Sequence, residues 1–331
     1  MNDAQPLVSI ITPAYNRASF LDETVQSILN QDYPRIEYIV LDDGSTDNTK
    51  EVLGKYTGRI IWETHPNMGE TRTVNKGWSM SHGDIVAVVN SDDPLLPGAV
   101  STAVAFLQSH PDILVAYPDW NYIGPDSKFA GHIQVPDYDY LFMLRHHRCS
   151  VGPGAFIRRK AFEMTGMRDP EFRYVADFEY WLRLGLHGKF ARIPKTLATW
   201  RVHSDAASLS HKGTAMADEH IRLMQKFYSR PDLPLEIIKV RAEAYSWAYY
   251  IAAISVGSSC RVAFKYYLKS VGYHPRSYLN SVNSLTKLGT VIVTTLPRPL
   301  YVLLVRCWHT GRLILARGYR LFKKRLRHRQ G

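Results

Sequence analysis

The sequence predicts an α/β fold, with a mostly parallel sheet flanked by helices and a helical extension at the C-terminal end. Over the first 120 residues, short apolar runs typical of buried strands alternate with amphipathic helical patterns. Strands separated by single helices imply right-handed crossovers and therefore parallel strands. From about residue 216 onward, the pattern is helical and rich in tyrosine and aliphatic residues.

Five strands are expected in the first 120 residues. In chain order, their ranges are 7–11, 36–41, 59–62, 85–89 and 113–117. Helices are expected between them, beginning near Ser19, after Ser45, near Glu70 and at Pro97. The fourth strand is apolar throughout, which favours a central place in the sheet. Residues 120–215 are less regular, with a helical pattern near 177–187.

The charge of the chain is distributed unevenly. The 331 residues carry a formal net charge of +11, yet no aspartate or glutamate follows Glu243, whereas residues 244–331 contain 15 lysines and arginines. Such a basic C-terminal region is typical of a contact with an anionic membrane or a nucleic acid. A nucleic-acid-binding protein would interleave basic and aromatic residues on one surface. Here the body is mildly acidic, so nucleic acid is not the expected partner.

Cysteine usage and the N-terminal sequence predict a cytoplasmic location. Cys149, Cys260 and Cys307 are widely spaced and odd in number. This pattern disfavours a zinc site or a disulfide framework and favours a reducing compartment. The first residues lack the basic and apolar segments of a signal peptide.

Polar residues gather after three of the predicted strands, at 12–17, 42–45 and 90–93. Ligands of parallel α/β sheets bind beyond the carboxyl ends of the strands, so the three clusters are expected to meet at one edge. Asp92 and Asp93 follow a buried strand directly, and adjacent carboxylates attract a hard cation such as Mg²⁺ or Mn²⁺. An ordinary turn that ends the strand explains the same residues without a metal.

Taken together, these segments resemble the family 2 glycosyltransferases, which have the GT-A fold. The similarity rests on Val8–Arg17, Leu41–Asp47, Asn75–Gly77 with Gly83 and Asp84, and Asn90–Asp93. It extends in order over roughly residues 7–205. It implies a Rossmann-like catalytic domain at 1–215, with a nucleotide-sugar half at 1–120 and an acceptor half at 121–215. A helical basic region at 216–331 would follow.

The resemblance implies a metal-dependent, inverting transfer of a hexose from a nucleotide-diphospho-sugar to an acceptor hydroxyl. The residues implied in donor binding are Pro13, Tyr15, Asn16, Asp43, Asn75, Asp92, Arg201 and His203. Pro13 and Tyr15 would flank the nucleobase, and Asp43 would read its edge. Asp92 would contact the ribose and Asp93 would hold the metal.

Two further implications concern the phosphates. The segment Arg201-Val202-His203 resembles the Arg-x-His segment that closes over the donor phosphates, although a purely structural histidine is the alternative. Many members carry arginine directly before the asparagine of the third motif, where this chain has Val74. We expect Arg72 or Lys76 to take its place near the diphosphate.

Asp177 is the catalytic base that the resemblance implies. The family has an acidic motif at this point, often Glu-Asp, of which only the aspartate is present here because Ala176 precedes it. An acceptor hydroxyl must lose its proton as it attacks the anomeric carbon, and a carboxylate can accept that proton. Taken by itself, Asp177 is equally an acidic residue stabilising a helix N-terminus. The absence of the Gln-x-x-Arg-Trp motif of processive synthases predicts transfer of a single sugar.

The last residues predict a membrane-interface segment within 288–331. The apolar run at 288–305 is interrupted by Pro297, Arg298 and Pro299, so no membrane span is expected. Beyond it, apolar and basic residues occupy different faces of one predicted helix, a pattern typical of an anionic membrane interface. Packing of this helix on the catalytic domain is the alternative.

A membrane contact would place the protein peripherally on the cytoplasmic face of the inner membrane. The acceptor would then be a glycan or a lipid-linked molecule in polysaccharide or glycolipid assembly. A polyprenyl-phosphate glycosyltransferase, whose acceptor is a phosphate, is the nearest alternative. A catalytically inactive sugar-binding relative is a second one, which the retained Asp93 and Asp177 disfavour.

Overall fold

The computed structural model describes residues 5–203, 213–256, 259–278 and 287–292, which fall into two compact units. The first unit contains the described residues up to 203 together with 225–240. The second unit contains 213–224 and the described residues from 241 onward.

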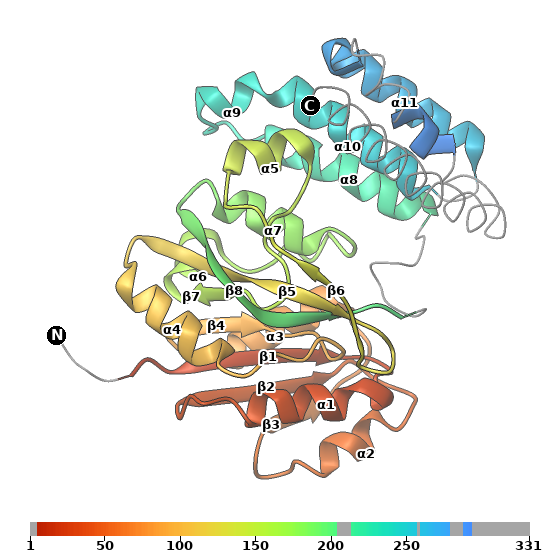
Figure 1. Cartoon of the computed structure of the whole chain (residues 1–331). Helices are drawn as coiled ribbons and strands as arrows, with labels where there is room; N and C mark the ends of the chain where they lie inside the picture. Colours follow the sequence, from red (N-terminus) through yellow and green to blue (C-terminus); the bar gives the residue numbers. More distant parts are fainter. Residues whose placement is uncertain (1–4, 204–212, 257–258, 279–286, 293–331) are drawn as a thin grey trace, which may run out of the picture. The chain divides into compact units, whose positions relative to one another are not determined.

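One sheet forms the centre of the first unit, and its eight described strands are arranged in the order β3-β2-β1-β4-β7-β5-β6, with β8 paired to β5 (Figure 1). The strands are β1 (Val8–Ala14), β2 (Ile36–Asp42), β3 (Ile61–Thr64), β4 (Ile85–Val88), β5 (Ile113–Ile123), β6 (Phe129–Ile133), β7 (Phe156–Arg158) and β8 (Lys189–Arg201). Strands β3, β2, β1 and β4 are parallel neighbours. The predicted α/β class and the parallel direction of the first four strands are therefore confirmed.

The other half of the sheet differs from the expectation. β7 lies between β4 and β5 and is antiparallel to both, so the fifth predicted strand is not a neighbour of the fourth. β6 is antiparallel to β5, whereas β8 is parallel to it. A three-residue strand such as β7 is too short to show a period in the sequence, which is why the pattern at 120–215 looked irregular.

The described helices of the first unit have the following bounds. They are α1 (Ala18–Leu29), α2 (Thr49–Gly54), α3 (Glu70–Met80), α4 (Ala99–Ser109), α5 (Tyr140–His146), α6 (Lys160–Thr165), α7 (Ala176–Leu184) and α9 (Leu235–Lys239). Every residue of β1 is buried. α3 approaches β1 very closely at Gly77, where a Cβ would lie 2.5 Å from Cγ2 of Ile11. A larger residue there would push the helix off the strand.

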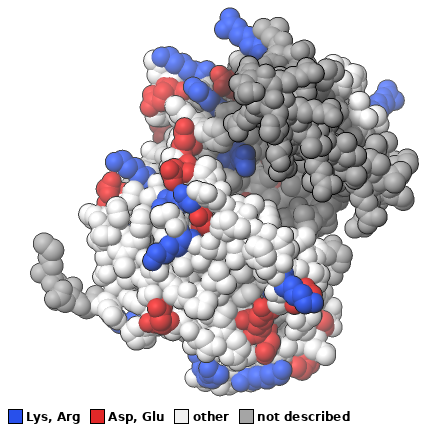
Figure 2. All heavy atoms as spheres, viewed as in Figure 1, with Lys and Arg blue, Asp and Glu red and all other residues white. Residues whose placement is uncertain are grey.

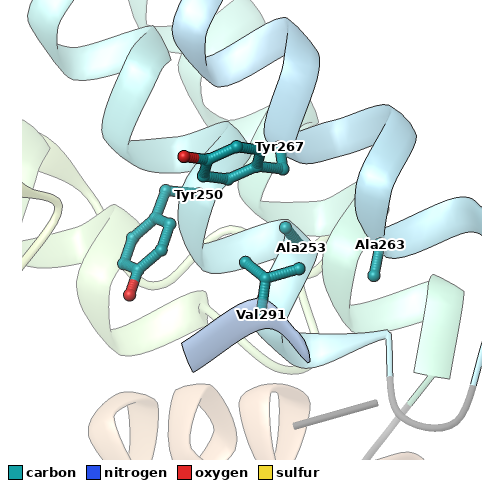
Figure 3. Packing of buried hydrophobic residues seen from close by; sticks show 5 residues of the cluster. All are labelled: Tyr250, Ala253, Ala263, Tyr267 and Val291. Atoms are coloured by element: carbon teal, nitrogen blue, oxygen red, sulfur yellow. The ribbon is translucent and has the colours of Figure 1, made fainter. Parts of the chain in front are cut away.

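The second unit is helical in its described part. Its elements are α10 (Arg241–Ser255), α11 (Cys260–Tyr273), the 3₁₀ helix η1 (Pro275–Tyr278) and the first residues of α8 (Gly213–Tyr228), a helix whose end belongs to the first unit. α10 and α11 pack together through small and aromatic side chains. The cluster consists of Tyr250, Ala253, Ala263, Tyr267 and Val291 (Figure 3).

Within the described ranges, none of the helices has the length and apolar character needed to cross a membrane. The amphipathic helix that we expect after residue 305 lies outside the described residues.

Candidate active site

The loop after β4 presents Asp92 to two side chains that can carry positive charge. Oδ2 of Asp92 lies 2.9 Å from Nε2 of His203 and 3.2 Å from Nε of Arg17. Arg17 follows the end of β1, and His203 follows the end of β8. Three strand ends therefore converge on one carboxylate oxygen, as the parallel sheet predicts.

Asp93 faces the other way and is 5% exposed. Its Oδ1 accepts the backbone N–H of Arg201 at 2.7 Å, and its Oδ2 accepts the side-chain amide of Asn90 at 2.9 Å. Burial, followed by the neighbouring charge of Asp92, raises the pKa of Asp93 to about 7. Two carboxylates held this close favour a cation beside them, because a positive charge stabilises both ionised forms.

The residues of this loop fit a divalent cation that is shared with a phosphate ligand. Among the residues that the structure describes, no three His, Cys, Asp or Glu side chains form a complete metal site. Mg²⁺ and similar cations commonly take one or two protein carboxylates and complete their shell with water and substrate phosphates. Asp92, with His203 beside it, supplies such a partial shell.

Arg201 joins this loop to two other parts of the first unit, and its side chain is fully buried. Its Nε donates to the carbonyl of Asp92 at 2.9 Å. Its Nη1 donates to the carbonyl of Gly124 and to the hydroxyl of Ser127, at 3.0 and 2.9 Å, and its Nη2 donates to Glu23 at 2.6 Å. We expected Arg201 to contact the diphosphate. Its donors are instead used within the protein, which makes it a residue that positions the loop.

Asp43 holds the loop that leads into α3. Its two carboxylate oxygens accept the backbone N–H groups of Met68 and Gly69, at 2.7 and 3.0 Å. The turn that begins at Asp43 depends on Gly44, which has a φ of +75° and whose Cβ would lie 2.8 Å from the backbone nitrogen of Asn67. Asp43 is thus buried at the expected strand end, and both of its carboxylate oxygens are engaged with the backbone.

Asn16 performs a similar task at the end of β1. Its Oδ1 accepts the backbone N–H of Thr46 at 2.8 Å, and its own N–H donates to the hydroxyl of Ser45 at 2.8 Å. Pro13 is buried within β1, whereas Tyr15 is 46% exposed. Of the residues that we expected around a nucleobase, Tyr15 is the aromatic ring with a free surface for stacking.

Asn75 locks the backbone of Arg168. Its Nδ2 donates to the carbonyl of Arg168 at 2.7 Å, and its Oδ1 accepts the N–H of the same residue at 3.1 Å. Val74 is fully buried, so the position where many relatives have arginine faces the core here. Of its expected substitutes, Lys76 forms an ion pair with Glu63 and Arg72 is exposed.

Asp177 lies in the first turn of α7 and is exposed. Its Oδ1 accepts the N–H of Phe178 at 2.7 Å. Within α7, Glu179 and Arg183 form two side-chain hydrogen bonds of 2.8 and 2.9 Å, and Arg183 also donates to the carbonyl of Met167 at 2.7 Å, which ties the helix to the preceding segment. The carboxylate is therefore accessible on a helix that is held firmly.

Three residues of this region were not assigned a role from the sequence: Arg17, Glu70 and Arg168. Arg17 ends the first polar cluster and could have been noticed as a cation at a strand end. Glu70 is the first residue of α3 and lies 3.7 Å from Nη1 of Arg168. Arg168 belongs to none of the motifs described above. Its contact with α3 joins residues that are far apart in the chain.

Comparisons with known proteins agree on one family. The family model described as "Glycosyl transferase family 2" matches residues 9–166. Chondroitin synthase of Pasteurella multocida (strain Pm70) is 28% identical over 228 residues, which are 66% of this chain and 23% of that protein. The UDP-Glc:alpha-D-GlcNAc-diphosphoundecaprenol beta-1,3-glucosyltransferase WfaP of Escherichia coli is 30% identical over 61% of this chain and 80% of its own length. The chain spans less than a quarter of the length of the Pasteurella chondroitin and hyaluronan synthases that it matches.

Solved structures with the same fold include two glycosyltransferase complexes. S. aureus TarS 1-349 in complex with UDP-GlcNAc has a TM-score of 0.62 at 18% identity, covering 82% of this chain and 91% of that one. The mannosyltransferase PcManGT from Pyrobaculum calidifontis, in complex with GDP-Man and Mn²⁺, has a TM-score of 0.57 at 16% identity. That match covers 93% of this chain and 84% of the mannosyltransferase. At these identities the similarity concerns the fold alone.

Proposed function

This chain belongs to glycosyl transferase family 2, and we propose on that premise that it transfers a single hexose from a nucleotide-diphospho-sugar to an acceptor hydroxyl with inversion. The observation that carries the proposal is the convergence of Asp92, Arg17 and His203 at the carboxyl ends of three strands. One carboxylate and two cation-capable groups at such an edge suit a diphosphate bound together with a metal.

We assign the metal contact to Asp92 rather than to Asp93, which reverses the roles expected from the sequence. Asp93 already accepts hydrogen bonds on both oxygens from Arg201 and Asn90. The outward oxygen of Asp92 lies beside His203 and Arg17. A phosphate-bound Mg²⁺ or Mn²⁺ could bind this oxygen. Asp93 then keeps the loop in place, and Arg17 is the cation nearest to the phosphates.

The nucleoside would lie on the side of β1 and β2. Tyr15 offers an exposed ring for stacking, and Pro13 supports the backbone beneath it. Asp43 and Asn16 shape the loop edges that would meet the base, since both are tied to neighbouring backbone N–H groups. Asn75 contributes indirectly, through the backbone of Arg168.

In the proposed reaction the acceptor oxygen attacks the anomeric carbon as the bond from that carbon to the phosphate oxygen breaks. Asp177 takes the proton of the acceptor hydroxyl, and the nucleoside diphosphate departs on the opposite face. When bound, the metal stabilises the negative charge on the departing diphosphate. Arg17 adds positive charge at the same end, while the exposed position of Asp177 keeps it open to an acceptor.

The names of relatives support the donor and acceptor classes. TarS binds UDP-GlcNAc, PcManGT binds GDP-Man with Mn²⁺, and WfaP uses UDP-Glc and a diphosphoundecaprenol-linked sugar. We therefore propose a lipid-linked or glycan acceptor and a peripheral place on the cytoplasmic face of the inner membrane. A polyprenyl-phosphate acceptor is the nearest alternative, and mass spectrometry of the product would separate a sugar-phosphate linkage from a glycosidic one.

The proposal is tested by the thermal stability of the full chain with a panel of nucleotide-sugars, with and without Mn²⁺. We expect one nucleotide class to raise Tm only when Mn²⁺ is present. Asp92→Asn should remove the effect of Mn²⁺, whereas Asp112→Asn, which changes an exposed carboxylate at the start of β5, should not. Asp93→Asn should lower Tm without ligand. If no nucleotide-sugar changes Tm, the proposed donor class is wrong.

A further inference from the structure

The outer face of α11 combines exposed apolar side chains with basic ones. Phe264 and Leu268 are 47% and 54% exposed, which is unusual for such large apolar groups on a packed helix. Arg261, Lys265 and Lys269 lie on or beside the same face, and together with these two residues they line one hollow of the surface. The opposite face packs on α10: Ala263 and Tyr267 belong to the cluster in Figure 3, and the carbonyl of Ser270 accepts the hydroxyl of Ser246 at 2.8 Å.

We infer that this face of α11 docks on an anionic lipid bilayer. Residues three and four apart share a helix face, so Arg261, Phe264, Lys265 and Leu268 would meet one plane together. Apolar side chains beside lysine and arginine are the pattern of a helix that lies in the headgroup region. No aspartate or glutamate follows Glu243 in the sequence, so an anionic surface would complement these charges.

The exposed apolar residues Phe264 and Leu268 favour a bilayer over a nucleic acid as the partner of this face. A nucleic-acid surface would be dominated by contacts between basic groups and phosphates, to which Leu268 contributes nothing. A bilayer accepts both kinds of side chain, since the basic groups meet the headgroups while the apolar groups enter the acyl boundary. This inference does not depend on the sugar chemistry proposed above.

The test uses the full chain and vesicles of phosphatidylcholine with or without phosphatidylglycerol. Each basic residue near an anionic surface contributes about fivefold to binding, so Arg261→Gln with Lys265→Gln should weaken binding by about 25-fold. Phe264→Ser should weaken it as well. The matched control is Lys128→Gln with Lys189→Gln, which removes the same charge from exposed sites of the first unit and should have little effect.

Equal vesicle binding by the α11 variants and the wild type would overturn the inference, because other parts of the chain would then suffice. Equal losses in the α11 pair and the control pair would also overturn it, since only net charge would matter. The same holds if the α11 variants lose binding to a DNA oligonucleotide but not to vesicles. Unchanged Tm of each variant shows that the fold is intact.

A second, independent observation concerns the Glu70–Arg168 pair. Arg168 is 9% exposed, and its Nε has no hydrogen-bond partner. Its guanidinium lies over the ring of Trp78, 5.6 Å from the centroid, and near Glu70. A buried arginine with an unused donor costs free energy unless a ligand or a partner completes it. Asn75 holds its backbone on both sides.

The first turn of α3 connects the two ends of the proposed site. On one side, the N–H groups of Met68 and Gly69 bind Asp43. On the other side, the hydroxyl of Thr71 donates to the carbonyl of Phe172 at 2.9 Å, and that segment leads to Asp177. Glu70 lies between these anchors with a side chain that is 56% exposed, and desolvation by its surroundings, followed by the nearby charges of Asp177 and Asp92, raises its pKa.

We propose that Glu70, held by Arg168, binds hydroxyl groups of the donor sugar and thereby helps to select it. The proposal rests on the proposed function, in which the sugar must lie between the diphosphate near Asp92 and the base Asp177. A carboxylate there accepts hydrogen bonds from sugar hydroxyls, and Arg168 keeps it oriented.

The test compares donors that share a nucleotide, such as UDP-glucose and UDP-N-acetylglucosamine. Glu70→Gln should change the ratio of their kcat/KM values by about tenfold or more, with affinity for free UDP unchanged. Arg168→Lys should change the ratio in the same direction. Glu163→Gln, an exposed carboxylate of α6, is the matched control.

An unchanged ratio in Glu70→Gln would overturn this second proposal, and so would an equal loss for both donors together with weaker UDP binding, which a structural role predicts. A wild-type protein that uses no nucleotide-sugar would instead refute the proposed function itself. The two failures are therefore distinguishable.

Discussion

The two units of this chain use charge in opposite ways. In the first unit, basic side chains are matched by acidic ones on other elements, as in Arg201 with Glu23 and Arg192 with Asp119. Basic and acidic side chains are interspersed on the face of this unit that Figure 2 shows. In the second unit, acidic residues end at Glu243 and basic ones continue. The first arrangement pairs charges within the fold, whereas the second leaves basic side chains that suit the anionic surface proposed above.

The largest expected effect is that of Asp177→Asn, because this residue belongs to the first unit, where we propose that the reaction occurs. We expect turnover to fall by about 10²–10⁴-fold, the usual contribution of a general base, with donor affinity retained. Single-turnover kinetics and donor titration measure the two quantities. Glu163→Gln should leave both unchanged. Full turnover in Asp177→Asn would remove the base assignment.

Arg201→Met should destabilise the first unit by about 3 kcal/mol. The change leaves the acceptors of Asp92, Gly124 and Ser127 without their donor and removes the buried charge that pairs with Glu23. Hydrogen exchange followed by mass spectrometry should show faster exchange in β4 and β8, with the α10 and α11 peptides unaffected. Equal loss of protection in α10 and α11 would contradict independent stabilisation of the two units.

Asn75→Ala should lower the free energy of unfolding by about 2 kcal/mol, because it removes two hydrogen bonds to the backbone of Arg168. Urea denaturation measures the change. Ser79→Ala, which removes one exposed hydrogen bond to the backbone of the same helix, should cost less than about 1 kcal/mol. Similar effects of the two variants would mean that the Arg168 segment is held by other contacts.

The smallest expected effect is that of salt. Raising the ionic strength to about 1 M screens exposed charges, so the second unit should gain stability from weaker repulsion while the first unit loses a little. Each change should stay below about 1 kcal/mol. Hydrogen exchange at two salt concentrations reports on both units in one experiment, and changes of the same sign in both would refute the contrast.

The sequence predicted the parallel half of the sheet because each strand there is a continuous apolar run followed by polar residues. It did not predict the insertion of β7 between β4 and β5, because three residues carry no period. The family of the chain followed from a set of motifs in order rather than from any one of them.

Within the site, residue types were easier to predict than their tasks. Two adjacent aspartates on a strand end point in different directions, and the sequence does not say which one faces outward. Arg201 and Asn75 were expected on the donor, yet their hydrogen bonds go to protein atoms far away in the chain. Such long-range hydrogen bonds arise from tertiary packing and leave no local pattern in the sequence.

The hydrogen bond from Arg201 to Asp93 spans 108 residues of sequence. The family model ends at residue 166, so it includes both aspartates of the loop but neither Arg201 nor His203. A fragment or chimaera cut at that boundary would carry the recognisable motif without the strand that orients it. A donor-binding domain transferred into another enzyme should therefore extend through His203. Without β8, the carboxylates of the motif would lose the strand that orients them.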